Sequence, residues 1–199
     1  MSTRPTLILG STSRYRRELL ERLRLPFEVH APDVDETPLP GEAPAALAQR
    51  LALAKAHAVA AVHPEAVVIG SDQVADLDGL PIGKPGTHER AVEQLRAMRG
   101  RSIVFQTAVA VVRASTGYVG TALAPVTVRF RQLSDEEIEH YLRTEQPYDC
   151  AGSAKCETLG IALLDAIDSD DPTALVGLPL IRTCALLRAA GIDPLAPPR

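Results

Sequence analysis

An uninterrupted apolar run at residues 66–70 limits the possible fold of this chain more than any other feature of its sequence. A short apolar run bounded by polar residues is typical of a buried strand. Ser71, Asp72 and Gln73 follow the run directly. The sequence therefore predicts a strand of a sheet whose end carries a carboxylate and an amide.

The rest of the chain alternates between helical and extended patterns. The predicted helices span residues 13–23, 45–62, 87–98, 134–143 and 180–190. The other predicted strands span residues 6–9, 27–30, 103–112, 118–130 and 160–164. Asp78-Gly79 signals a tight hairpin turn, and Ser134 with Glu137 forms a capping box. This mixed order predicts an α/β protein whose sheet is not purely parallel.

Length, charge and cysteine content exclude several classes of protein. A chain of 199 residues suits one domain or two small lobes that share a cleft. The net charge of −4 argues against a partner that is a nucleic-acid polymer, since such binding needs a basic surface. No apolar stretch is long enough for a membrane span or a signal peptide. The three cysteines lack metal-ligand spacing, so we expect a cytoplasmic protein with free thiols.

A basic segment at residues 10–17 lies where the first predicted strand turns into a helix. It contains Ser11, Ser13, Arg16 and Arg17. Free backbone N–H groups at a helix start attract anions, and one arginine guanidinium can bind two phosphate oxygens at once. The segment therefore predicts a triphosphate cradle, although it lacks the P-loop pattern. The alternative is an ordinary serine cap followed by a solvated basic helix face.

Carboxylates form a second group of candidates. Asp72 follows the buried strand, Glu36 lies in a loop at residues 31–41 that is rich in proline and acid, and Glu157 comes later. Carboxylates over a phosphate cradle are what a hard divalent cation and a water-activating base require. The alternative for each is a turn residue, a helix cap or a solvated loop residue.

Lysines form the third group. Lys84 lies between Gly83 and Pro85, so its position is restricted by a turn, and it can neutralise charge on a leaving pyrophosphate. Lys55 in the alanine-rich helix and Lys155 are less specific candidates. A surface turn is the alternative for Lys84. Because the histidines show no paired spacing, we expect no histidine ligand or base.

Several ordered motifs together resemble the Maf family of nucleotide pyrophosphatases across nearly the whole chain. They read STSRYRRELL, DVDETP, GSDQV, GKP, CAGSAKCETLG and VGLPL. The resemblance implies an α/β fold of the Maf and inosine-triphosphatase type, with a mixed twisted sheet and flanking helices. It also implies one domain over residues 1–199, with two lobes around a central cleft.

The activity implied by this resemblance is hydrolysis of a nucleoside triphosphate between its α and β phosphates, with Mg, Mn or Co as the divalent cation. Asp72 matches the proton acceptor, and Glu36 and Asp72 match the metal ligands. The residues that match base-selecting positions are Tyr15, Gln73 and Glu157. The residues that match phosphate-binding positions are Ser11, Ser13, Arg16, Arg17, Lys55 and Lys84.

The segments 71–73 and 150–157 resemble the family branch that acts on 7-methyl-GTP more than the branch that acts on dTTP and UTP. Tyr15 stands where that branch usually has tryptophan. Two alternatives stay open: a pyrophosphatase for dTTP, UTP or another modified nucleotide, and a non-catalytic nucleotide sensor linked to septum formation. A small enzyme with an apolar closing helix is also a candidate homodimer.

Overall fold

A mixed sheet of seven strands forms the centre of the computed structural model, which describes residues 5–196. The strand order is β2-β1-β3-β5-β6-β7, and β4 pairs with β3. The strands are β1 Leu7–Gly10, β2 Glu28–His30, β3 Val67–Leu77, β4 Leu80–Ile82, β5 Ser102–Arg113, β6 Tyr118–Phe130 and β7 Leu164–Asp168. The pairs β1·β2 and β1·β3 are parallel and the others are antiparallel, so the expectation of a mixed α/β sheet is confirmed.

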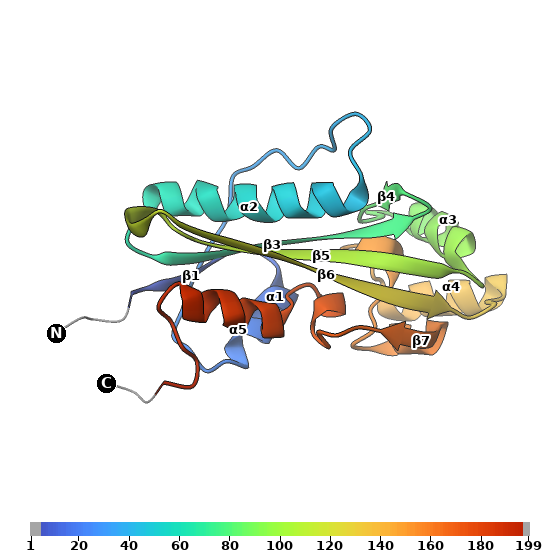
Figure 1. Cartoon of the computed structure of the whole chain (residues 1–199). Coiled ribbons are helices and arrows are strands. Elements are labelled where there is room, and N and C mark those ends of the chain that lie inside the picture. The colour runs from blue at the N-terminus through green and yellow to red at the C-terminus, as the bar shows by residue number, and fades with distance from the viewer. Residues whose placement is uncertain (1–4, 197–199) are drawn as a thin grey trace.

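Helices cover both faces of this sheet (Figure 1). The helices are α1 Arg14–Glu21, α2 Pro44–Val62, α3 His88–Met98, α4 Asp135–Glu145 and α5 Leu180–Ala189. Short 3₁₀ turns occur at Ala114–Thr116, Ala151–Ser153, Leu159–Leu163 and Ala174–Val176. In Figure 1, α2 lies on one face of the sheet, and α1 and α5 lie on the other. Helices α3 and α4 lie near the start of β5 and the end of β6.

The alternation of side chains along the strands explains this layering. Val68 and Val112 pack in one core cluster with α2, whereas Ile69 and Val111 pack in another with α1 and α5. Successive strand residues point to opposite faces, so strands covered on both sides need continuous apolar runs. A third cluster around Phe105 and Phe130 packs α3 and α4 against the far part of the sheet.

Several local predictions are confirmed. Ser13 and Thr87 cap α1 and α3, and the capping box of Ser134 and Glu137 begins α4. The predicted strand at residues 160–164 is wrong. Residues 159–163 form a 3₁₀ turn, and β7 begins at Leu164. The backbone here bonds locally, because the Ile161 N–H donates to the Thr158 carbonyl at 3.2 Å.

The prediction that the strand ends near residue 70 is also wrong, because β3 continues through Ser71, Asp72 and Gln73 to Leu77. The reason is β5, which pairs with β3 from Val68 to Asp76 and satisfies its backbone groups along one edge. On the other edge β1 pairs with β3 only as far as Ile69, and β4 pairs with it only from Ala75 to Leu77. Asp72 therefore lies at a gap between two partner strands.

Gly70 brings helix α2 close to this gap. A Cβ atom at Gly70 would lie 2.2 Å from the Ala52 carbonyl oxygen and 2.6 Å from the Ala56 nitrogen. Glycine therefore permits a close approach of backbone to backbone between β3 and α2. Lys55, between these two α2 residues in the chain, is consequently within reach of the next polar side chains on β3.

Candidate active site

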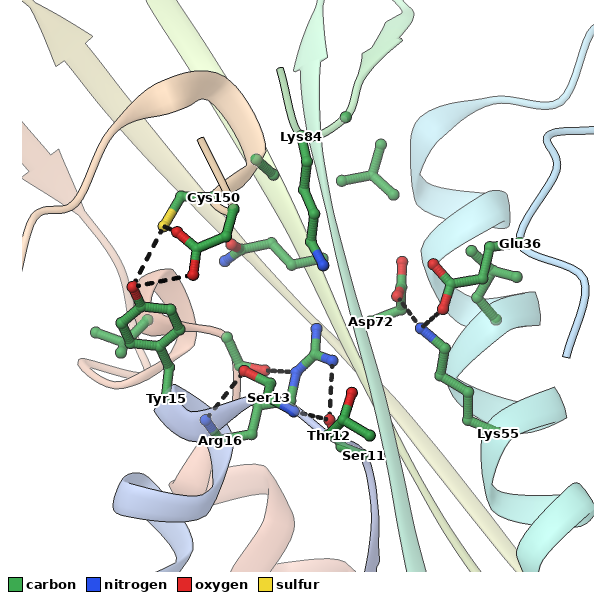
Figure 2. Close-up of a pocket in the computed structure, with 18 of the residues that line it drawn as sticks. Ser11, Thr12, Ser13, Tyr15, Arg16, Glu36, Lys55, Asp72, Lys84 and Cys150 are labelled. Atoms are coloured by element: carbon green, nitrogen blue, oxygen red, sulfur yellow. Dashed lines mark hydrogen bonds and ion pairs between the residues drawn. The ribbon is translucent and has the colours of Figure 1, made fainter. Parts of the chain in front are cut away.

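A pocket opens where β1 and β4 leave β3 unpaired, and its volume is about 660 Å³. This size is usual for a site that encloses a small organic ligand. Some of the residues in the segments 11–16, 32–38, 47–55, 72–74, 81–84, 149–157 and 175–177 form its walls, and Arg50 and Lys155 are not among them. Figure 2 shows side chains from these distant segments converging on one cavity. The predicted candidates in the pocket wall are Ser11, Ser13, Tyr15, Arg16, Glu36, Lys55, Asp72, Gln73, Lys84 and Glu157.

The start of α1 forms one wall. The Ser13 N–H donates to Ser11 Oγ at 3.2 Å, and Ser13 Oγ accepts from the Arg16 N–H at 3.5 Å. The Arg16 guanidinium donates from Nε to the Gly177 carbonyl at 2.9 Å and from Nη1 to Ser11 Oγ at 3.4 Å. Burial lowers the pKa of Arg16, while the charges of Asp72 and Glu36 act against this shift. A fixed cation thus lies at a helix start, as an anion site requires.

Arg17 lies outside the pocket, contrary to the sequence-based expectation. Its side chain is 62% exposed and donates from Nε to Glu21 Oε1 at 3.1 Å, one helical turn away. Arg17 follows Arg16 about 100° further around α1, and at this position its side chain points toward Glu21 on the outer face of the helix. Spacing alone identified a basic segment but not which arginine faces inward.

The centre of the pocket is a lysine that bridges two carboxylates. Lys55 Nζ lies 2.7 Å from Asp72 Oδ1 and 2.7 Å from Glu36 Oε1 (Figure 2). The Lys55 and Asp72 side chains are only 6% and 10% exposed, whereas that of Glu36 is 58% exposed. Burial would raise the pKa of Glu36, but the hydrogen bond and charge of Lys55 outweigh it and lower this pKa. Glu36 is therefore ionised at neutral pH.

Lys84 supplies a second cation. In Figure 2 its side chain extends into the space between Tyr15 and Asp72. Among residues 5–196, no side chain forms an ion pair with its ammonium group. The turn that carries it is fixed, because the Gly83 carbonyl accepts from Gln94 Nε2 at 3.1 Å and from the Gly152 N–H at 3.4 Å.

The opposite end of the pocket is aromatic and acidic. The Tyr15 hydroxyl donates to Asp149 Oδ2 at 3.5 Å and accepts a hydrogen bond from Cys150 Sγ at 3.8 Å. Burial raises the pKa of Tyr15, so its hydroxyl stays a donor at neutral pH. Burial also raises the pKa of Cys150, to about 12, which makes this thiol a poor nucleophile. The Arg14 guanidinium lies 4.7 Å from the Tyr15 ring centroid and donates from Nη2 to the Tyr15 hydroxyl at 2.7 Å, and Lys155 Nζ lies 5.9 Å from the same centroid.

Gln73 has a well-defined orientation. Its Nε2 lies 2.9 Å from Thr107 Oγ1, 3.0 Å from the Ala174 carbonyl and 2.9 Å from the Leu175 carbonyl, and its two hydrogens are shared among these three acceptors. Two backbone carbonyls accept hydrogen bonds only, so this amide atom must be the nitrogen. Only Oε1 of Gln73 is left to contact a ligand, and it is an acceptor.

Sequence reasoning missed three parts of this site. Asp149 and Cys150 face Tyr15 across 134 and 135 positions of the chain; Cys150 begins the CAGSAKCETLG motif, but no local signal identifies Asp149. The carbonyl of Gly177 accepts from both Arg16 Nε and Ser71 Oγ, the latter at 2.9 Å. Gly177 belongs to the VGLPL motif, which hinted at its importance. Lys155 is outside the pocket wall and pairs with Glu145 at 3.0 Å.

The comparison with protein families decides the assignment. Residues 6–190 match the model of the Maf-like proteins. The chain belongs to the Maf-like family. Relatives named 7-methyl-GTP pyrophosphatase include one from Polaromonas sp., 73% identical over 96% of this chain and 87% of the relative. Another is from Albidiferax ferrireducens, 70% identical over 94% of each chain, and a third is from Thiobacillus denitrificans, 58% identical over 98% of each.

This Maf-like protein has two further properties that bear on its function. Within residues 5–196, no helix is long and apolar enough to cross a membrane. The same part of the chain contains no group of three or more His, Cys, Asp or Glu side chains placed to hold a metal ion.

Proposed function

We propose that this Maf-like protein hydrolyses 7-methyl-GTP to 7-methyl-GMP and pyrophosphate. The high identity to relatives that carry this activity in their names supports the proposal. The observation that carries it is the placement of Asp72, Arg16 and Lys84 on the wall of one pocket. A carboxylate beside two cations is the arrangement that water activation next to a polyphosphate needs.

In the proposed reaction Asp72 orients and deprotonates a water molecule. Its Oδ1 is held by Lys55 at 2.7 Å, so Oδ2 is the oxygen that accepts the proton. The water oxygen bonds to the α-phosphorus while the bond from that phosphorus to the α,β-bridging oxygen breaks. Pyrophosphate leaves with the bridging oxygen, and the monophosphate keeps the water oxygen. The contact with Lys55 holds the Asp72 carboxylate in place, which positions the base before substrate arrives.

The cationic wall binds the triphosphate and the departing pyrophosphate. Nε and Nη1 of Arg16 are held by Gly177 and Ser11, so its remaining Nη2 is free for phosphate oxygens. Lys84 adds a mobile ammonium, and the hydroxyl groups of Ser11 and Ser13 lie at the helix start. These groups stabilise the negative charge that develops on the leaving group.

The carboxylates also fit a divalent cation, which we propose to be Mg, Mn or Co. Lys55 contacts Glu36 Oε1 and Asp72 Oδ1, which leaves Glu36 Oε2 for the cation, and Asp72 Oδ1 has a second lone pair for it while Oδ2 faces the water. Mg²⁺ is commonly held by one or two carboxylates together with substrate phosphates. When bound, such a cation supplies Lewis-acid stabilisation of phosphate charge. The lysine bridge places both carboxylates at one point before any ligand arrives.

Base selection is proposed for Tyr15, Gln73 and Glu157. A 7-methylated guanine is cationic, so an aromatic face and nearby carboxylates favour it. Glu157 and Asp149 supply negative charge at this end of the pocket, and Gln73 presents an acceptor. Guanine carries N–H donors on its N1 and N2 atoms, which match this wall of acceptors.

A panel of triphosphates with Mg²⁺ or Mn²⁺, scored for monophosphate and pyrophosphate, tests the proposal. Preferential cleavage of 7-methyl-GTP supports it. Preference for dTTP or UTP would instead assign the protein to the family branch that acts on those nucleotides. Binding without pyrophosphate release would indicate a non-catalytic nucleotide sensor. Asp72→Asn is the matched inactive variant, because it keeps the shape of the side chain and removes the base.

We also propose that residues 1–199 form one domain with two lobes and a single active-site cleft. One continuous sheet that carries all three core clusters supports this. A cytoplasmic location and a homodimer stay predictions.

A further inference from the structure

Arg50 of α2 is joined to the loop at residues 31–43 by three hydrogen bonds. Its Nε donates to Glu42 Oε1 at 2.6 Å, and its Nη2 donates to Glu42 Oε2 at 2.8 Å. The same Nη2 donates to the Thr37 carbonyl at 3.1 Å. One guanidinium therefore fixes the loop at two places, and one of them is the residue next to Glu36.

Further hydrogen bonds connect these places within the loop. Glu42 Oε2 also accepts from the Leu39 N–H at 3.0 Å, and Asp35 Oδ1 accepts from the Thr37 N–H at 2.9 Å. The Glu42 side chain is only 8% exposed, and the bond to Arg50 lowers its pKa to about 2. Glu42 is thus a charged partner at every pH at which the enzyme would work.

Hydrophobic packing does not hold this loop in place. Residues 35–41 are all exposed, and the Glu36 side chain is 58% exposed. A loop without buried side chains keeps its conformational entropy unless polar contacts fix it. Figure 1 shows the loop rising away from the sheet before it enters α2. Two polar connections to α2 therefore determine where Glu36 lies: Arg50 holds the backbone at Thr37, and Lys55 holds the Glu36 carboxylate.

We propose that Arg50 is a positioning residue for the reaction, holding the backbone at Thr37 so that Glu36 reaches Lys55 beside Asp72. This inference rests on the proposed function, because the role of Glu36 does. Arg50 itself is absent from the pocket wall, so it acts through the loop and not through substrate. Its planar fork suits this task, because one side chain contacts a carboxylate twice and still reaches a carbonyl.

Arg50→Ala tests the proposal. We expect kcat to fall roughly ten- to hundredfold, because small misplacements of active-site groups have effects of that size, with little change in KM. Hydrogen exchange of the amides in residues 35–42 should accelerate, while the strand amides keep their protection. Arg96→Ala is the matched control: Arg96 makes a bidentate pair with Asp135 at 3.2 and 2.8 Å, far from the pocket wall, so kcat should not change.

A double-mutant cycle with Glu36→Gln separates positioning from a general structural effect. If Arg50 acts through Glu36, the variant with both changes has the same kcat as Glu36→Gln alone. If the effects of the two changes on kcat multiply in the double variant, the proposal is overturned. It is also overturned if the loop amides exchange hydrogen faster in Arg50→Ala while kcat is unchanged. If the wild-type protein released no pyrophosphate, the proposed function would fail, whereas the exchange measurement would still test the connection of the loop to Arg50.

Discussion

Lys55 Nζ lies 2.7 Å from Asp72 Oδ1, and both side chains are almost fully buried. The two residues come from different layers, α2 and β3, that approach closely at Gly70. A buried charge pair costs solvation energy, so its presence here is better explained by chemistry than by stability. The pair holds a charged carboxylate ready at the centre of the pocket.

Removal of the carboxylate should abolish turnover. Asp72→Asn keeps the shape of the side chain but cannot accept a proton, so pyrophosphate release should fall at least about 100-fold. Release measured by a coupled assay checks this, with circular dichroism to confirm folding. Asp165→Asn changes an exposed carboxylate on β7 and should leave the rate unaltered. An Asp72→Asn enzyme with full activity would contradict the proposed base.

Variants of the two pocket lysines should differ in their effects on stability and on activity. Lys55→Met leaves the Asp72 charge buried without its partner, so unfolding free energy should drop by about 3–5 kcal/mol. Lys84→Met removes an exposed ammonium and should change unfolding free energy by less than about 0.5 kcal/mol, while turnover falls. Denaturant titration of both variants beside the activity assay measures this. Equal stability losses would show that the pair does not have the inferred energetic role.

Arg16 and Arg17 are adjacent and chemically identical, so they form a matched pair of variants. Arg16→Ala should lower kcat/KM for the triphosphate by roughly ten- to hundredfold, the usual effect of losing a hydrogen bond to a charged group. Arg17→Ala should leave kcat/KM unchanged, since this side chain pairs with Glu21 outside the pocket. Steady-state kinetics decide between them. A large loss in Arg17→Ala would mean that α1 rotates when substrate binds.

The acidic end of the pocket should control preference for the methylated base. Glu157→Gln removes one negative charge from the pocket wall that also carries Tyr15, so the ratio of kcat/KM for 7-methyl-GTP over GTP should fall roughly tenfold. Turnover of GTP itself should persist. Glu18→Gln, a change outside the pocket wall, is the control. A ratio that stays constant in Glu157→Gln would remove this residue from base selection.

The connection of the loop to Arg50 should weaken only in strong acid. The bond to Arg50 holds the pKa of Glu42 at about 2, below its ordinary value of 4.5. A carboxyl with a lowered folded-state pKa stabilises the fold above its unfolded pKa and loses that effect as pH falls toward the folded value. The Tm difference between wild type and Glu42→Gln should therefore be constant above about pH 5 and shrink between about pH 4.5 and 2. A constant difference down to pH 2.5 would contradict the shift.

Local features were predictable because they depend on neighbours in the chain. The capping box at Ser134 and Glu137 is visible in the sequence because its two residues are one helical turn apart. The motif residues that suggested phosphate chemistry were also readable, since side-chain chemistry does not change on folding. The extent of β3 was not, because its length depends on pairing with β5, about 36 positions away at Asp72 and Ala108.

Most helices and strands, and all the chemical groups, can be read from the amino-acid order: a capped basic helix, a buried strand with Asp72, and lysines in restricted positions. Which of these groups meet in one site depends on the folded chain. It directed Arg16 inward and Arg17 outward, placed Asp149 opposite Tyr15, and used the Gln73 amide to hold residues 174 and 175. The physical reason is that a site needs groups within hydrogen-bond distance, and distance between remote residues is set by packing and strand pairing, not by position along the chain.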